Sequence, residues 1–229
     1  MRTIGMLGGM SWESTAIYYR RANELTRERL GGLHSAPILL HSVDFAPIER
    51  LQVAGDWHAA GEILAEAAVG LERAGAGLLV LCTNTMHLVA PQIEDACDIP
   101  LLHIVDVTAD HVAAQGISRV GLLATAFTME QPFYVERMAE RGIECIVPDA
   151  KDRAEVHRVI YDELCQGVVR EESRASYRTV IERLVARGVE GIVLGCTELE
   201  LLVGQDDSPV PVFATTSLHV TAAIDAAQT

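Results

Sequence analysis

The sequence lacks a basic cluster, paired cysteines and a long hydrophobic run, and Lys151 is its only lysine. Eighteen basic residues against 32 acidic residues leave a net charge of −14. A negative field of this size repels phosphate backbones, so we expect no nucleic-acid partner. The longest apolar runs, such as residues 77–82, are far shorter than the roughly 20 residues of a membrane helix. We therefore expect no membrane partner either.

The five cysteines are an odd number, and their spacing shows no pairs: they are Cys82, Cys97, Cys145, Cys165 and Cys196. A disulfide framework is not expected from this pattern, which is more typical of thiols in a cytosolic chain. Residues 1–4 run straight into a strand-like segment, without the apolar core of a signal peptide. These features predict a cytoplasmic protein. The composition is globular, with 49% hydrophobic residues, and excludes a disordered chain.

Apolar β-type runs alternate with longer helical patterns along the chain. Near-continuous apolar runs are typical of parallel strands buried on both faces. We predict strands over residues 3–7, 37–43, 78–81, 101–104, 119–124, 143–147, 191–194 and 210–213, and helices over residues 11–29, 56–74, 132–141, 174–187 and 217–227. Gly75, Gly142 and Gly188 fit left-handed helix ends, and Thr128 with Gln131 and Asp152 with Glu155 fit capping boxes. Repeated βα units predict an α/β fold with doubly wound parallel sheets.

The sequence also repeats itself. Residues 4–9, 79–83 and 99–101 resemble residues 120–125, 193–197 and 210–212, at offsets of 116, 114 and 111. Three matches in the same order predict two pseudo-symmetric, doubly wound parallel-sheet domains. We place residues 1–105 plus 212–229 in the N-terminal domain, which carries Cys82. Residues 106–211 form the second domain, which carries Cys196.

Cys82 and Cys196 occupy matching places in the two halves. Each follows an apolar strand and precedes a threonine at an expected helix start, where Thr197 with Glu200 fits a capping box. A cysteine at a helix N-terminus meets free N–H groups and the positive end of the helix dipole, which favour its thiolate. Open α/β sheets also bind ligands at the carboxyl ends of their strands. The alternative is that both are small buried hydrophobic residues, but the repetition favours a functional pair.

A second candidate is the glycine-containing turn over residues 8–14, which follows the first predicted strand and opens a helix. Glycines let a backbone approach a ligand, and exposed N–H groups can hold an anion. The turn lacks the lysine of a phosphate-binding loop and the third glycine of a dinucleotide fingerprint. A tight strand-to-helix turn without any ligand is the alternative.

Metal binding is not expected. Cys82 and His87 are separated by four residues, but a zinc site needs four converging ligands, and no short Cys or His pairs supply them. His157 and His219 lie on helical patterns, where we expect surface or packing roles.

Three motifs together resemble those of the aspartate/glutamate racemase superfamily, within it the aspartate-racemase branch and its broad-specificity amino-acid relatives. They are residues Gly8–Thr15, Cys82–Thr85 and Gly195–Glu198, and the resemblance covers the whole chain. It implies a racemase without cofactor, built from two pseudo-symmetric α/β domains with the active site between them. It also implies a homodimer, a small amino-acid substrate and one catalytic cysteine in each domain, Cys82 and Cys196.

The same resemblance implies a set of substrate-binding residues. The substrate carboxylate would be held by Met10, Thr83, Asn84, Thr85 and Thr197, and Arg50 and Gln52 would also reach the substrate. Cys165 stands where aspartate-specific relatives carry a lysine that reads a second carboxylate. We therefore expect a broad amino-acid range, with an aspartate-specific racemase as the alternative.

Racemisation of this kind needs two bases. One thiolate removes the α-proton, and the opposite thiol delivers a proton to the other face. Lys151 follows no predicted strand end, so no pyridoxal phosphate site is indicated. A decarboxylase or cis–trans isomerase of the same superfamily is a further alternative, although such a decarboxylase needs only one cysteine. A non-catalytic small-ligand-binding protein is the alternative from another class.

Overall fold

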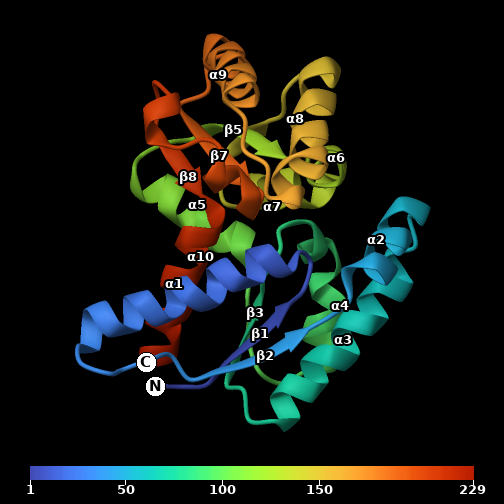
Figure 1. The fold of residues 1–229 in the computed structure, drawn as a ribbon, viewed down its shortest axis with the longest axis vertical. Coiled ribbons are helices and arrows are strands. Elements are labelled where there is room, and N and C mark those ends of the chain that lie inside the picture. The colour runs from blue at the N-terminus through green and yellow to red at the C-terminus, as the bar shows by residue number, and fades with distance from the viewer. The chain divides into compact units, whose positions relative to one another are not determined.

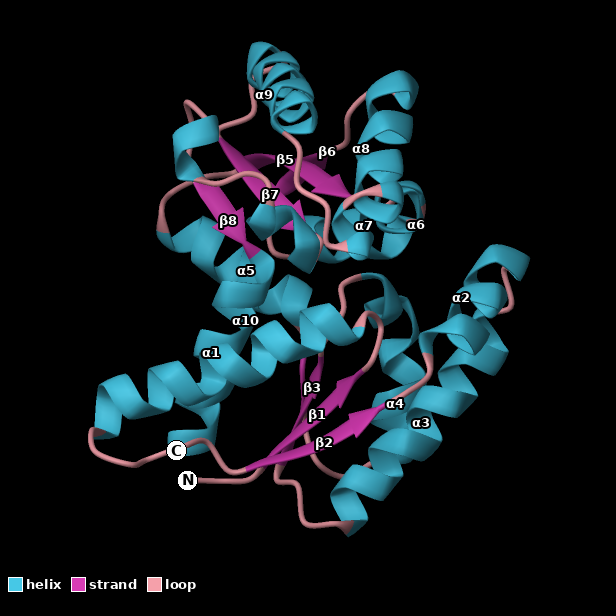
Figure 2. Cartoon of the chain, viewed as in Figure 1, coloured by secondary structure: helices cyan, strands magenta, loops and turns pink.

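The computed structural model describes all 229 residues and contains two four-stranded sheets, in which every pair of neighbouring strands is parallel (Figures 1 and 2). The first sheet has the order β2-β1-β3-β4, and the second has the order β6-β5-β7-β8. The strands are β1 Ile4–Gly8, β2 Ile38–Ser42, β3 Leu78–Leu81, β4 Leu101–Leu102, β5 Arg119–Ala124, β6 Glu144–Ile146, β7 Gly191–Gly195 and β8 Val212–Ala214. All eight predicted strands are confirmed, each within two residues at either end.

Helices surround the strands of both sheets. The α-helices are α1 Trp12–Leu30, α2 Phe45–Ala54, α3 Trp57–Arg73, α4 Ala90–Ala96, α5 Ile104–Ala114, α6 Ala126–Glu130, α7 Pro132–Glu140, α8 Ala150–Asp162, α9 Glu171–Ala186 and α10 Thr215–Gln228. Four short 3-10 helices are η1 Thr85–Val89, η2 Leu164–Gln166, η3 Thr197–Leu201 and η4 Gln205–Asp207. Gly75, Gly142 and Gly188 have positive φ angles of 98°, 76° and 85°, so the predicted left-handed positions are confirmed. None of the helices is long and apolar enough to span a bilayer.

Neither of the two capping boxes predicted for the second half forms. Thr125 caps α6, because its hydroxyl accepts the N–H of Thr128 at 3.3 Å, and Pro132 then starts the next helix. Asp149 caps α8 by accepting the N–H of Asp152 at 2.9 Å. In both cases the cap lies three residues before the predicted one, because an earlier residue of the right type already serves the free N–H groups.

The chain divides into two compact units, Met1–Ile104 with His219–Thr229, and Val105–Leu218. The sequence pattern predicts that residues 212–229 belong to the first domain. In the structure β8 pairs with β7, and the chain returns to the first unit only at His219. Residues 212–218 therefore complete the second sheet.

The first unit buries both faces of its sheet. Helices α1 and α10 lie on one face (Figure 1), and their buried side chains include Tyr18, Ala22, Val220 and Ile224. The other face packs against α3 and α4, whose buried side chains include Leu64, Ala68 and Ile93. Helices on both faces of a parallel sheet leave only the strand ends open, and Cys82 follows one of those ends.

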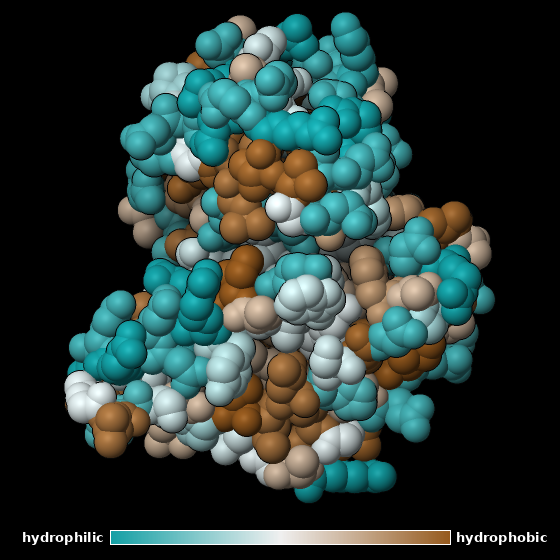
Figure 3. Space-filling model, in the orientation of Figure 1, coloured by the Kyte–Doolittle hydropathy of each residue, from teal (hydrophilic) through white to brown (hydrophobic).

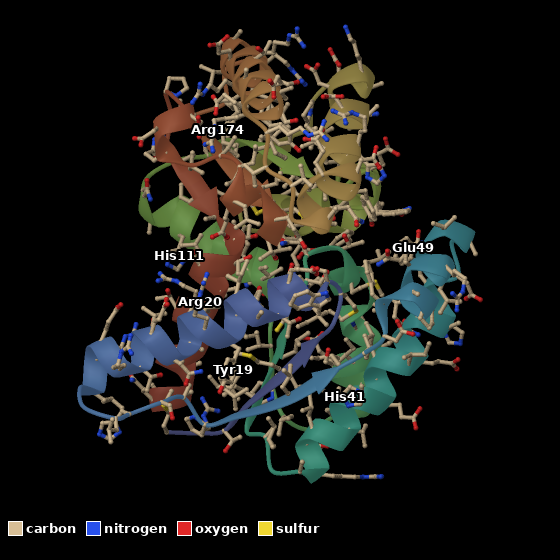
Figure 4. The ribbon with its side chains drawn as sticks, in the orientation of Figure 1. Tyr19, Arg20, His41, Glu49, His111 and Arg174 are labelled. Carbon is tan, nitrogen blue, oxygen red and sulfur yellow. The ribbon has the colours of Figure 1, made fainter.

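The second unit repeats this strand order along its own half of the sequence. Mainly hydrophilic side chains cover α8 and α9 (Figure 3). On α9, Arg174 (labelled in Figure 4) and Arg178 reach the buried carboxylate of Asp207 at 3.2 and 2.6 Å. Burial alone would raise the pKa of Asp207, but the N–H of Gly204 and the two arginines outweigh it and lower the pKa. This network fixes the loop after η3.

Candidate functional site

Both predicted cysteines lie at the carboxyl end of an inner strand. Leu81 ends β3 and Cys82 follows it, while Gly195 ends β7 and Cys196 follows it. In each sheet this strand lies third in the order, between the strand that opens the unit and the edge strand. The repeat found in the sequence therefore corresponds to a structural repeat.

Cys82 is fully buried, and the carbonyl of Val80, 3.7 Å away, accepts its S–H. Burial raises the pKa of this thiol far above its ordinary value. The helix that follows is only the five-residue η1, and Asn84 at its N-cap makes no capping bond with its side chain. The prediction of a favoured thiolate is therefore wrong for Cys82, because desolvation exceeds the effect of so short a helix.

Cys196 is partly exposed and is the N-cap residue of η3. Its thiol donates to a carboxylate oxygen of Glu198 at 3.0 Å. Desolvation raises the pKa of Cys196 well above its ordinary value, and the Glu198 carboxylate raises it further. The thiolate is disfavoured here too, contrary to the prediction. The capping box of Thr197 with Glu200 also fails to form, since the η3 N-cap makes no side-chain capping bond.

Glu198 is a site residue that the sequence analysis missed. It lies within one of the quoted motifs, but we gave it no role. The signal was its position two residues after a strand-end cysteine, which in a tight turn brings carboxylate and thiol together. Glu198 is only 5% exposed, and its contact with Cys196 is partly buried.

In the first unit, the structure brings some of the predicted substrate-binding residues together. Thr83, Asn84 and Thr85 are buried beside Cys82. Gln52 of α2 joins this segment, because its side-chain amide N–H donates to the sulfur of Met86 at 2.9 Å. The Oε1 atom of Gln52 is buried and has no hydrogen-bond partner, so it can accept a donor from a ligand. Arg50 is exposed on the same helix, which also carries Glu49, labelled in Figure 4.

The glycine-containing turn is held by its own contacts. Gly9 has a φ of 96°, and a Cβ atom there would clash with the carbonyl oxygen of Val43. Its N–H donates to the Thr15 hydroxyl at 2.8 Å, while Ser11 caps α1. The amide of Gly9 is thus used inside the turn, which favours the alternative of a tight strand-to-helix connection at this residue. Met10, at 6% exposed, packs into the core of the first unit.

In the second unit, Thr197 is buried directly after Cys196, and Cys165 lies in η2. Helix η2 packs against η3, and Cys165 is near enough to contribute to the raised pKa of Cys196. The structure brings together no group of three or more His, Cys, Asp or Glu side chains that could hold a metal ion.

Three buried histidines, His87, His103 and His219, lie close together in the first unit, and His87 belongs to η1, the helix that follows Cys82. The ring centroids of His87 and His103 are 4.6 Å apart, and those of His87 and His219 are 5.8 Å apart. His219 donates from Nε2 to the carbonyl of Leu102 at 2.8 Å, and its Nδ1 accepts the Tyr18 hydroxyl at 2.9 Å. Burial lowers the pKa of His219 to about 4, so the ring is neutral near pH 7.

This histidine predicts a pH-dependent stability. In the unfolded chain His219 takes up a proton near pH 6.5, whereas the pKa of the folded ring is about 4. The contribution of His219 to the free energy of unfolding is therefore fully present above pH 6.5 and is lost as the pH falls from 6.5 towards 4. Between pH 7.5 and 5 the loss is about 2 kcal/mol. We expect His219→Gln, whose amide still donates and accepts, to lack this loss in urea unfolding. His58→Gln, at an exposed position, should keep it, and equal pH dependence in wild type and His219→Gln would contradict the assignment.

The comparisons with known proteins identify the family and support the fold. The family model for Asp/Glu/hydantoin racemases matches residues 7–223. A candidate Asp/Glu racemase from Yersinia pestis is 54% identical, with both chains fully covered and a TM-score of 0.94. An aspartate racemase homologue from Pyrococcus horikoshii is 33% identical, again with full coverage of both chains and a TM-score of 0.88.

A broad specificity amino-acid racemase from Bacillus subtilis is 23% identical over 219 residues, which cover 91% of each protein. The family match spans nearly the whole sequence, and the two structural relatives share the complete fold. This protein therefore belongs to the Asp/Glu/hydantoin racemase family, and it is an isomerase of the racemase type.

Proposed function

We propose that this protein interconverts L- and D-amino acids without a cofactor, using Cys82 and Cys196 as a pair of acid–base groups. The observation that carries the proposal is the presence of one cysteine at the carboxyl end of the matching inner strand in each of two sheets of the same topology. Inversion at an α-carbon needs one proton carrier for each face, and a repeated thiol supplies two equivalent carriers.

The reaction begins with the formation of one thiolate. Both thiols have raised pKa values, so the resting enzyme holds both as S–H. Glu198 accepts the hydrogen bond from Cys196 and is the nearest group to take its proton. The Cys196 thiolate then removes the α-proton from one face, and the Cys82 thiol gives its proton to the other. The enzyme is left with a Cys82 thiolate, a Cys196 thiol and a protonated Glu198, and in this form the Cys82 thiolate runs the reverse reaction. Before another turnover in the first direction, Cys82 regains a proton and Cys196 gives one up.

The substrate would be held by polar groups around the thiols. The buried segment Thr83–Thr85 and Thr197 offers hydroxyl, amide and N–H donors to the substrate carboxylate, where negative charge grows as the α-proton leaves. The unpartnered Oε1 of Gln52 is suited to accept an N–H of the substrate ammonium. Met10 contributes apolar surface from the same core cluster as Met86.

We also propose a broad substrate range. A second carboxylate needs a cationic partner when it is buried. Cys165 cannot supply a positive charge beside Cys196, and Arg50 is exposed on α2. The broad-specificity relative from Bacillus subtilis is in line with this proposal. An aspartate-specific enzyme remains the second candidate, supported by the aspartate racemase homologue from Pyrococcus horikoshii.

The test is α-proton exchange in D2O across a panel of amino acids, followed by kcat/KM for racemisation. We expect neutral and polar amino acids such as homoserine and methionine to react at least as well as aspartate, with glutamate a poor substrate. Cys165→Lys should shift the preference toward aspartate, while Cys165→Ser serves as the uncharged control. A wild-type preference for aspartate above about tenfold, or 1.4 kcal/mol, would contradict the broad range and direct attention to Arg50. Absence of exchange with every amino acid would contradict racemisation itself.

A further inference from the structure

The chain passes between the two units only twice. It leaves the first unit between Ile104 and Val105 and returns to it between Leu218 and His219. Both passages fall in the first turn of a helix, α5 in the first case and α10 in the second. The first turns of these two helices are therefore the covalent connections of the two cysteine-bearing units.

His87 links the Cys82 segment to the first of these helices. The N–H of Ile104, the first residue of α5, donates to Nε2 of His87 at 3.2 Å. A nitrogen that accepts carries no proton, so in the neutral ring Nδ1 carries it. Nδ1 lies 2.7 Å from the carbonyl oxygen of Thr83 and donates to it. One buried ring thus joins the residue after Cys82 to the start of α5.

Glu200 makes the corresponding connection in the second unit. One oxygen of its carboxylate accepts the N–H of Thr216 at 3.2 Å, and the other accepts the Ser217 hydroxyl at 2.9 Å. These two residues form the first turn of α10. Both contacts are partly buried, and desolvation raises the pKa of Glu200.

The two connections are related by the repeat. His87 lies five residues after Cys82 on η1, and Glu200 lies four residues after Cys196 on η3. Each accepts a first-turn N–H of the helix that follows the last strand of its sheet, β4 before α5 and β8 before α10. Different chemistry, an imidazole and a carboxylate, serves the same connection in the two halves. Because two different side chains accept the corresponding N–H in the two halves, the hydrogen bond to the helix, rather than the kind of side chain, is the shared feature.

We propose that His87 and Glu200 are positioning residues for the two thiols, each holding its cysteine segment to the helix through which the chain passes to the other unit. The inference rests on the proposed two-cysteine racemisation. A thiol acts as a proton carrier only over a narrow range of distance and direction, and a displacement of about 1 Å can cost a hundredfold in rate. Loss of either connection therefore loosens one thiol and leaves the other in place.

Matched variants distinguish the effect of losing the hydrogen bond from the effect of changing the size of the side chain. His87→Gln keeps a donor and an acceptor on one planar group, and Glu200→Gln keeps an oxygen for the N–H of Thr216. His87→Leu and Glu200→Leu remove the acceptors. We expect the leucine variants to lose at least about tenfold in kcat with little change in KM, and the glutamine variants to stay within about threefold of wild type. His58→Gln is the exposed control.

A kinetic isotope effect identifies which thiol has been loosened. Each thiol removes the α-proton of only one enantiomer. When one thiol is loosened, its proton transfer becomes slower than the other transfer. The deuterium isotope effect on kcat/KM then rises for the α-deuterated enantiomer that this thiol deprotonates and falls for the other enantiomer. In His87→Leu the isotope effect should rise for the enantiomer that Cys82 deprotonates and fall for the other enantiomer. In Glu200→Leu the two changes should be reversed.

A merely structural role would lower the amount of active enzyme and leave both isotope effects unchanged in both variants, which would overturn the proposal. If a leucine variant does not fold, His87→Asn and Glu200→Asp, too short to span both partners, take its place. Amide hydrogen exchange at Ile104 and Thr216 gives a readout apart from activity, and faster exchange at only the matching amide is expected. A wild type without racemase activity would contradict the proposed function. An active wild type with unchanged His87 and Glu200 variants would contradict only this inference.

Discussion

Replacing Cys82 by serine is expected to lower the racemisation rate by at least about a thousandfold, and replacing Cys196 by serine is expected to have the same effect. A positioned acid–base group contributes about 10²–10⁴ to the rate, and in the proposed mechanism each cysteine serves one face of the α-carbon. A serine hydroxyl ionises at far higher pH than a thiol, so at neutral pH almost no base remains on that face. The two side chains are nearly equal in size, so the buried position of Cys82 should accept the change without loss of the fold.

The measurement is the rate of inversion by polarimetry beside the rate of α-proton exchange in D2O. Each variant keeps one thiol, so exchange without inversion can survive for one enantiomer, and that enantiomer should differ between the two variants. Alanine variants should behave in the same way. Cys97→Ser is the matched control, because Cys97 is a free thiol near Glu72 that the proposed chemistry does not use. Full racemase activity in either of the two serine variants would show that the cysteine concerned is only a packing residue.

The positions of both thiols could be predicted because they follow from the hydrophobic pattern. Near-continuous apolar runs, such as residues 78–81 and 191–194, are typical of strands buried on both faces, and the structure confirms them. Residues that directly follow such strands then lie at the carboxyl edge of a parallel sheet, whatever the details of the helices. The repeat between the two halves added independent support, since both sheets have the same strand order.

The ionisation of the thiols could not be predicted in this way. The sequence suggested helix N-termini that would favour thiolates, but η1 and η3 are only five residues long. Burial is the largest contribution at Cys82 and at Cys196, and it acts in the opposite direction. The extent of burial depends on packing from distant parts of the chain, which local residue patterns do not contain.

The hydrogen bonds of His87 and Glu200 could not be predicted for the same reason, because their partners come from distant parts of the chain. Ile104 and His87 are 17 residues apart, and their bond depends on the pairing of β4, which precedes Ile104, with β3, which precedes Cys82 and η1. His87 looked like an incomplete zinc motif in the sequence, and Glu200 looked like a helix-capping residue. Each turned out to accept an N–H at the start of a later helix. Residue type gave the bonding capacity, while the fold decided the partner.

Replacing Glu198 by glutamine is expected to lower kcat/KM at pH 7 by about ten- to a hundredfold and to change its dependence on pH. In the mechanism proposed here, the proton of Cys196 passes to Glu198, whose carboxylate oxygen lies 3.0 Å from the sulfur, so the pair would make a thiolate without releasing a proton to water. That step is independent of pH while the pair keeps its one proton. In Glu198→Gln the proton must go to solvent, so the rate should rise about tenfold for each pH unit until Cys196 ionises.

The direction of the pKa change in this variant follows from its causes. Desolvation is the largest contribution to the raised pKa of Cys196, and the Glu198 carboxylate adds to it. Glutamine removes the charge and keeps the burial, so the pKa of Cys196 should fall and still remain above that of an ordinary thiol. Glu198→Asp keeps the charge on a shorter side chain and is the matched control, with a profile expected to stay close to that of the wild type.

Profiles of kcat/KM from pH 6.5 to 9.5 test whether the Cys196 proton goes to Glu198 in the wild type and to solvent in Glu198→Gln. Alkylation of Cys196 in a Cys82→Ser background, measured over the same range, follows the thiolate directly without turnover. We expect alkylation of Cys196 in the Glu198→Gln variant to begin at lower pH than in the parent with Glu198, because loss of the carboxylate charge makes the thiol easier to ionise. Racemisation at pH 7 should fall in the same variant, because the acceptor of the Cys196 proton is lost. Wild-type activity at pH 7 in Glu198→Gln would show that the proton of Cys196 leaves by another group, and the substrate's own carboxylate would then be the nearest chemical alternative.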